Sequence, residues 1–206
     1  MIRRSRLPRR GLLTLLVLLI LCGCTQRAEP QLSPEPEAPQ ALSWDALEYE
    51  RSLELLYAEQ FSVEYYTNGY QKIAIGDGNR YLVVPEGAEV PSGVPEEVTV
   101  LRQPLDSIYL VATSAMDLFR QLDAIDTITL AGLDAGGWYI EEAREAMEAG
   151  RMVFAGKYGA PDYERILDLG CDLAVESTMI YHNPEVKEQL ERLGVPVLVE
   201  RSSYES

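Results

Sequence analysis

Residues 161–200 read PDYERILDLGCDLAVESTMIYHNPEVKEQLERLGVPVLVE and alternate between helical and extended patterns. A proline followed by acidic residues is typical of a first helical turn, and a glycine is typical of a helix end. Short apolar runs between such helices predict buried strands. The predicted elements are a helix over 161–169, a strand over 173–176, a helix over 184–193 and a strand over 195–199.

The same alternation extends toward the N-terminus, with strands predicted over 108–112, 127–131 and 152–155 and helices over 114–124 and 140–149. Four β–α units with short joints predict an α/β fold: a doubly wound, mostly parallel sheet with helices on both faces. Such a sheet binds ligands beyond the carboxyl ends of its strands. The segments that follow these ends are 113–114, 132–139, 156–160, 177–183 and 200–206.

A different pattern precedes this region. Residues 44–60 have apolar side chains at helical intervals, which predicts a short amphipathic helix. The alternating runs 61–66 and 70–75 are joined by Thr67-Asn68-Gly69, and Asn-Gly is a strong hairpin signal. A third strand over 81–84 completes a predicted three-strand meander.

The first residues predict export and lipid attachment. Five arginines precede residue 11, and the apolar run 12–21 is too short to span a membrane but suits a signal peptide. Leu21-Cys22-Gly23-Cys24 resembles the lipobox of bacterial lipoproteins, which implies cleavage after Gly23 and a lipid on Cys24. We therefore expect a signal peptide over 1–23, a Pro- and Glu-rich tether over 24–43, and a domain over 44–206 on the extracytoplasmic face of the cell membrane.

Charge and residue types exclude several functions. The formal charge is −15, and it becomes −20 when residues 1–23 are removed with their five arginines, so nucleic acid is not an expected partner. Among the three cysteines only Cys171 would stay free, and a buried apolar role suits it. The sequence has one histidine and none of the common nucleophile or phosphate-loop motifs, so we expect no enzyme activity and no resident cofactor.

Two motifs resemble the substrate-binding lipoproteins that serve ATP-driven importers of iron–siderophores or cobalamin. Residues 161–175 are similar to that family's proline, helix and Asp-Leu-Val pattern, and residues 189–197 are similar to its leucine-rich helix followed by Leu-Gly-x-Pro-Val. Val111-Ala112-Thr113-Ser114 corresponds to the opening strand whose end contacts ligand. The hairpin at Asn68-Gly69, together with residues 84–87, is similar to the segment that precedes this opening strand in a lipoprotein branch of the family.

The resemblance implies a protein that captures a ferric siderophore, haem, cobalamin or a similar metal chelate and delivers it to a permease and its ATPase. Family members continue into a second lobe, so we expect residues 44–206 to be the N-terminal lobe alone, with the C-terminal lobe absent. One lobe leaves much of a ligand exposed, which predicts weak or absent binding by residues 24–206. The alternatives are a single-lobe surface interaction lipoprotein and, less well supported, an α/β enzyme.

Polar and aromatic side chains on the strand-end segments are the candidate ligand-binding residues: Thr113, Ser114, Trp138, Tyr158, Ser177, Thr178, Met179, Tyr181, Arg201 and Ser203. Each has a structural alternative: the hydroxyls could cap helices, the aromatic rings could anchor loops, and Arg201 could pair with Glu200 or Glu205. His182 suits either a helix start or a hydrogen bond to a chelate. The family docks on its permease through glutamates, and Glu148 lies near the matching place.

Overall fold

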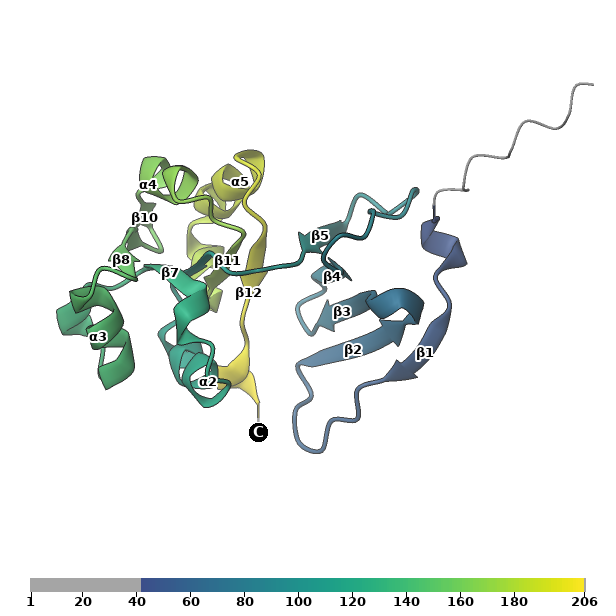
Figure 1. Ribbon diagram of the computed structural model, residues 1–206, viewed down its shortest axis with the longest axis horizontal. Helices are drawn as coiled ribbons and strands as arrows, with labels where there is room; N and C mark the ends of the chain where they lie inside the picture. The colour runs from purple at the N-terminus through teal and green to yellow at the C-terminus, as the bar shows by residue number, and fades with distance from the viewer. Residues whose placement is uncertain (1–41, 206) are drawn as a thin grey trace, which may run out of the picture. The chain divides into compact units, whose positions relative to one another are not determined.

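The computed structural model describes residues 42–205, so the predicted signal peptide, Cys24 and the tether up to residue 41 lie outside the described residues. Two five-stranded sheets follow one another along this part of the chain (Figure 1). The first is mixed and mainly antiparallel, and the second is entirely parallel. The mixed α/β class expected from the sequence is confirmed.

The first sheet has the order β1-β2-β3-β4-β5, in which β5 alone runs parallel to its neighbour. Its strands are β1 Tyr49–Ser52, β2 Phe61–Tyr66, β3 Gln71–Ile75, β4 Arg80–Val84 and β5 Val98–Arg102. The predicted meander is β2-β3-β4, and Asn68 and Gly69 both have positive φ, 62° and 84°, as the hairpin signal required. Strands β1 and β5, which form the two edges, are not predicted by the sequence pattern.

The prediction of a helix over 44–60 is wrong. Residues Trp44–Ala46 form one 3-10 turn (η1), and β1 then pairs with β2. Leu56 and Tyr57 are 79% and 83% exposed, so the apolar residues that suggested a helix do not share one buried face. Strand pairing with β2 outweighs the helical spacing because it satisfies backbone hydrogen bonds along an existing sheet.

The second sheet has the order β12-β11-β6-β7-β8. Its strands are β6 Ile108–Leu110, β7 Ile128–Ala131, β8 Val153–Phe154, β11 Leu173–Glu176 and β12 Val197–Val199. From β6 the chain builds outward through β7 to β8, then returns to the other side of β6 to place β11 and β12. This reversal between β6 and β11 is the switch point of a doubly wound sheet.

Four α-helices and seven 3-10 turns complete the described chain. The helices are α2 Met116–Gln121, α3 Glu141–Glu148, α4 Tyr163–Asp168 and α5 Pro184–Arg192, and the remaining 3-10 turns are η2 Thr67–Gly69, η3 Thr113–Ala115, η4 Ile125–Thr127, η5 Ala135–Gly137, η6 Thr178–His182 and η7 Ser202–Tyr204. No helix within residues 42–205 has the length and apolar character that crossing a bilayer requires.

Side chains alternate between the two faces of the parallel sheet. Ile108 and Leu110 pack in the cluster that contains the buried residues of α2 and α3, whereas Tyr109 packs in the cluster with those of α4 and α5. Helices therefore cover both faces, as predicted. The first sheet joins the α2 and α3 side through Tyr81, whose hydroxyl also donates a hydrogen bond to the Val197 carbonyl at 3.0 Å.

A small hairpin that the sequence analysis missed follows β8. Its strands are β9 Gly156–Lys157 and β10 Ala160–Pro161. Because Pro161 is in β10, the helix predicted over 161–169 begins only at Tyr163, and Asp162 caps it by accepting a hydrogen bond from the Arg165 amide at 3.1 Å.

The hairpin depends on glycine at position 156. Gly156 has a φ of 87°, and a Cβ there would lie 2.3 Å from the Ala160 carbonyl oxygen. We expect Gly156→Ala to lower the free energy of unfolding by at least about 3 kcal/mol, from backbone strain and steric overlap together. Gly78→Ala is the matched control: its φ is also positive but nothing lies within 4 Å, so its loss should be about 1 kcal/mol. Urea unfolding measures the free energy of unfolding of both variants. Equal losses would contradict the close approach of Gly156 to the Ala160 carbonyl oxygen.

Candidate functional site

The loops after β6, β11 and β12 begin side by side at the carboxyl edge of the parallel sheet. Val111 and Ala112 donate backbone hydrogen bonds to the Val175 carbonyl at 2.9 and 3.1 Å, and the Glu200 amide donates to the Glu176 carbonyl at 2.9 Å. The strand ladder thus continues to the start of each loop. Three of the segments predicted to face ligand, 113–114, 177–183 and the described part of 200–206, are held at one edge beside the switch point.

Hydroxyl groups connect these loops. Ser114 donates a short hydrogen bond to Glu200, and the hydroxyls of Thr178 and Tyr204 lie 3.4 Å apart. Neither Thr113 nor Ser114 caps a helix by a side-chain hydrogen bond, because both lie inside η3. The capping alternative therefore does not describe them, and the Ser114 hydroxyl instead joins the β6 loop to the β12 loop.

Tyr181 joins the carboxyl edge to the first sheet. Its hydroxyl donates a short hydrogen bond to Asp77 and accepts one from Asn79 at 3.4 Å. Burial and the Asp77 carboxylate raise the pKa of Tyr181 to about 12. Burial alone would raise the pKa of Asp77, but hydrogen bonds from Tyr181 and Asn79 outweigh it and lower that pKa. The pair is therefore a neutral phenol with an ionised carboxylate at neutral pH.

Arg201 is a second link to the first sheet. Its Nε donates to Gln60 Oε1 at 3.0 Å, and its guanidinium lies 4.3 Å from the centre of the Tyr204 ring. Within residues 42–205 its guanidinium makes no salt bridge to a carboxylate. The alternative in which Arg201 pairs with Glu200 or Glu205 is therefore not what the structure shows.

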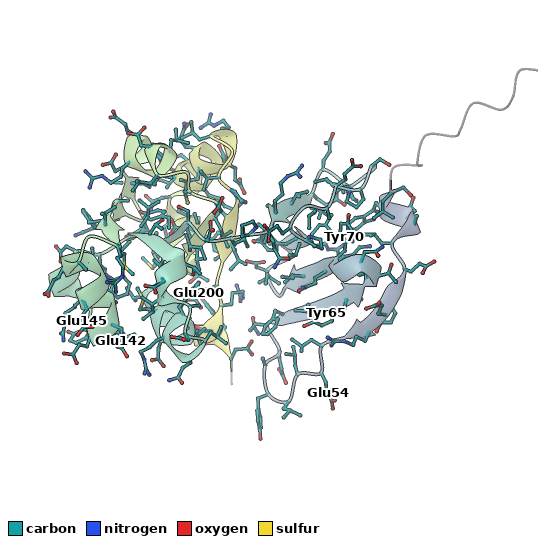
Figure 2. All side chains as sticks on the ribbon, in the orientation of Figure 1. Glu54, Tyr65, Tyr70, Glu142, Glu145 and Glu200 are labelled. Atoms are coloured by element: carbon teal, nitrogen blue, oxygen red, sulfur yellow. The ribbon has the colours of Figure 1, made fainter. Side chains whose placement is uncertain are left out.

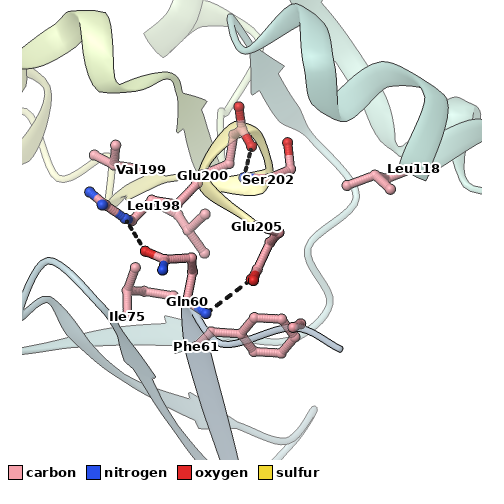
Figure 3. A pocket seen from close by; sticks show the side chains of 11 residues that line it. Gln60, Phe61, Ile75, Leu118, Leu198, Val199, Glu200, Ser202 and Glu205 are labelled. Carbon is pink, nitrogen blue, oxygen red and sulfur yellow. Dashed lines mark hydrogen bonds between the residues drawn. The ribbon is translucent and has the colours of Figure 1, made fainter. Parts of the chain in front are cut away.

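A cavity of about 340 Å³ lies beside Arg201. Figure 3 shows Phe61 and Ile75 lining it from the first sheet and Leu118 and Leu198 lining it from the parallel half. Its remaining lining residues are Ala58, Gln60, Val199, Glu200, Arg201, Ser202 and Glu205. The cavity thus has apolar walls and polar groups at the end of β12, which is the usual composition of a small-molecule site.

The other predicted ligand residues differ in where they lie. Ser177 caps η6 by accepting a hydrogen bond from the Met179 amide at 3.3 Å, and Met179 and Ser203 are exposed at the same edge. Trp138 is only 4% exposed and belongs to the core on the α2 and α3 side, so a ligand has no access to its ring faces. Tyr158 lies in the turn of the hairpin after β8, at the opposite end of the strand order from β12.

Glu148 lies on α3, away from the loops just described. The buried side of α3 consists of Ala143 and Ala146, and its exposed side carries four glutamates. Figure 2 shows two of them, Glu142 and Glu145, apart from Glu200 at the end of β12. The helix presents an acidic surface separate from the carboxyl edge, and the docking role of Glu148 stays a prediction.

Glu176, the last residue of β11, is not among the residues predicted from the sequence to form the site. Its side chain is completely buried, and neither carboxylate oxygen has a hydrogen-bond partner within the described chain. Burial raises its pKa to about 8, so it is protonated at neutral pH. Burial raises the pKa of Tyr109 and of Tyr163, and the charge of this carboxylate raises both further, after that of Glu185 in the case of Tyr163. A glutamate that ends an apolar run before Ser-Thr was the available signal.

This buried carboxyl should make stability depend on pH. The pKa is higher in the folded state than in the unfolded chain, so the folded state binds more protons between about pH 4.5 and 8 and loses stability as pH rises through that range. Glu176→Gln should abolish most of this slope and be more stable than the parent chain at pH 8 by a few kcal/mol, at about 1.4 kcal/mol per pKa unit. The measurement is the free energy of unfolding against pH. Glu148→Gln, an exposed control, should keep the parent slope, and a Glu176→Gln profile that also keeps it would contradict the assignment.

Neither family models and curated proteins nor the metal-ligating side chains of the described residues assign a function. Among residues 42–205 no group of three or more His, Cys, Asp or Glu side chains is arranged to hold a metal ion. No protein-family model matches the chain, and no curated protein matches it. The likeness to solute-binding lipoproteins thus stays a prediction from the sequence. The geometry of the carboxyl edge described above does not depend on that likeness.

Proposed function

We propose that the chain is an extracytoplasmic solute-binding lipoprotein of an ATP-driven importer. Its solute is a ferric siderophore or a related metal chelate, which is bound at the carboxyl edge and passed on without chemical change. The lipid on Cys24 and the tether to residue 43 hold it near the permease. Within this proposal, residues 44–206 act as one lobe of the binding protein.

One observation carries the proposal: the loops after β6, β11 and β12 meet beside the switch point of the parallel sheet. Had these loops opened at opposite edges, they could not have faced one ligand. They bring together hydroxyls, a phenol and a guanidinium, and such groups form hydrogen bonds to the oxygens of a chelate. This mixture supports the binding of an oxygen-rich ligand.

A second function is favoured by a different observation. The segment between β1 and β2 exposes Leu56 and Tyr57 almost completely, with Leu53 36% exposed beside them. Grouped exposed apolar side chains often mark contact with another protein. This surface supports the surface-interaction alternative, in which the chain binds a protein partner and no solute.

The test must detect weak binding, because one lobe covers only part of a chelate. High-spin ferric iron broadens the NMR signals of nearby amides, whereas the gallium complex of the same chelator is diamagnetic and has the same shape and charge. We expect a ferric tris-catecholate or tris-hydroxamate to broaden amide signals at 113–114, 177–181 and 200–204 selectively. The gallium complex should shift these signals without broadening them.

Three outcomes of that titration would contradict the proposal. Uniform broadening would indicate collisions with no site, and the absence of any effect across catecholate, hydroxamate, haem and cobalamin ligands would remove the solute-binding function. Broadening centred on Leu56 and Tyr57 would place the contact on the alternative surface.

Docking of the permease is tested separately through Glu148. Because Glu148 is exposed on α3 and lies away from the carboxyl edge, Glu148→Arg should abolish solute uptake in cells that carry the permease while leaving the NMR broadening intact. Glu164→Arg, an exposed glutamate on α4, is the matched control and should leave uptake unchanged. Normal uptake by Glu148→Arg would show that α3 does not dock.

A further inference from the structure

The cavity at the end of β12 combines an apolar interior with one cationic group. Leu118 is 51% exposed, and Phe61 and Ile75 are only partly buried, so a ligand in this cavity would remove apolar surface from water. The volume of about 340 Å³ is at the low end of the range of about 300–1,000 Å³ typical of ligand pockets. The cavity therefore suits a small molecule with an apolar body.

The acidic residues that line the cavity have their oxygens occupied. Glu200 accepts hydrogen bonds from the Ser114 hydroxyl and from the Ser202 amide, the latter at 2.8 Å. Glu205 accepts from the amides of Glu59 and Gln60 at 2.7 and 3.0 Å. Each carboxylate oxygen thus already has a donor from the protein, and these contacts offset part of the negative charge at the cavity.

Arg201 is different, because its charge has no direct counter-ion among residues 42–205. Gln60 Oε1 accepts a hydrogen bond from Arg201 Nε, and the Tyr204 ring lies against the guanidinium. These contacts fix the guanidinium but leave its two terminal amino groups without a carboxylate partner. The charge of Arg201 helps to lower the pKa of Asp77, but the Asp77 carboxylate already accepts hydrogen bonds from Tyr181 and Asn79. A planar fork of this kind recognises a carboxylate or a similar oxyanion.

We infer that this cavity binds a small organic anion, whose carboxylate or similar head group contacts Arg201 and whose aliphatic or aromatic body lies between Phe61, Leu118 and Leu198. The inference goes beyond the proposed function and holds whether or not the strand-end loops bind a metal chelate. It depends on the first sheet, since one wall of the cavity comes from β2 and β3.

Three probes with one apolar body and different head groups test this: octanoate, octanol and octylammonium, titrated into the 15N-labelled protein and followed by NMR. We expect octanoate to bind at least about tenfold more tightly than octanol, because a hydrogen bond to a charged group contributes about 1.5–3 kcal/mol. Octylammonium should bind most weakly, and the shifts should map to 58–61, 75, 118 and 198–202. Equal affinity for all three, or tighter binding of octylammonium, would overturn the inference.

Two variants separate the head from the body of the ligand. Arg201→Gln should lower octanoate affinity to that of octanol and leave octanol unchanged, whereas Leu118→Ala should weaken both by a similar factor of about five. Arg80→Gln removes the same charge from an exposed side chain of β4 that does not line the cavity, and it should behave as the parent chain. Octanoate binding that survives in Arg201→Gln at the parent affinity would show that Arg201 is not the anchor. The head-group series on the parent chain stands even if a variant fails to fold, and it is independent of any result with ferric chelates.

Discussion

The reversal of strand order between β6 and β11 is the constraint on which the rest of this structure depends. Because the crossover after β6 builds toward β7 and the crossover after β11 builds toward β12 at the other end of the sheet, the loops after β6 and β11 leave the sheet toward different faces. Backbone hydrogen bonds from Val111 and Ala112 to Val175, and from Glu200 to Glu176, hold the loop starts in register. The hydroxyl, phenol and guanidinium groups of the carboxyl edge are brought together by this backbone arrangement.

The first sheet also shapes the carboxyl edge. Tyr181 bonds to Asp77, Arg201 bonds to Gln60, and Glu205 accepts two backbone hydrogen bonds from the segment before β2. Tyr181 and Arg201 therefore have a structural contact and a proposed ligand contact at once. A ligand at this edge meets side chains already fixed in position, which lowers the conformational entropy lost on binding.

Local patterns predicted most of the parallel sheet and the Asn68-Gly69 hairpin, because apolar runs and turn glycines act over a few residues. They failed where long-range pairing decides the structure, as for residues 44–60, whose spacing is helical but which form a turn and an edge strand. The candidate site was predicted as far as strand ends define it. The contacts of Arg201 with Gln60 and of Tyr181 with Asp77 were not, since they join residues 141 and 104 positions apart. The burial of Glu176 likewise depends on elements distant in sequence.

Hydrogen exchange of the backbone amides, measured with and without a saturating ferric chelate, tests the central claim most directly. The claim is that the loops after β6, β11 and β12 form one binding surface. It predicts that exchange slows together at 111–115, 177–182 and 200–204, while the turns at the amino ends of the strands, 104–107 and 125–127, keep their rates. Slowing confined to one loop, or stronger at the amino-end turns, would contradict it.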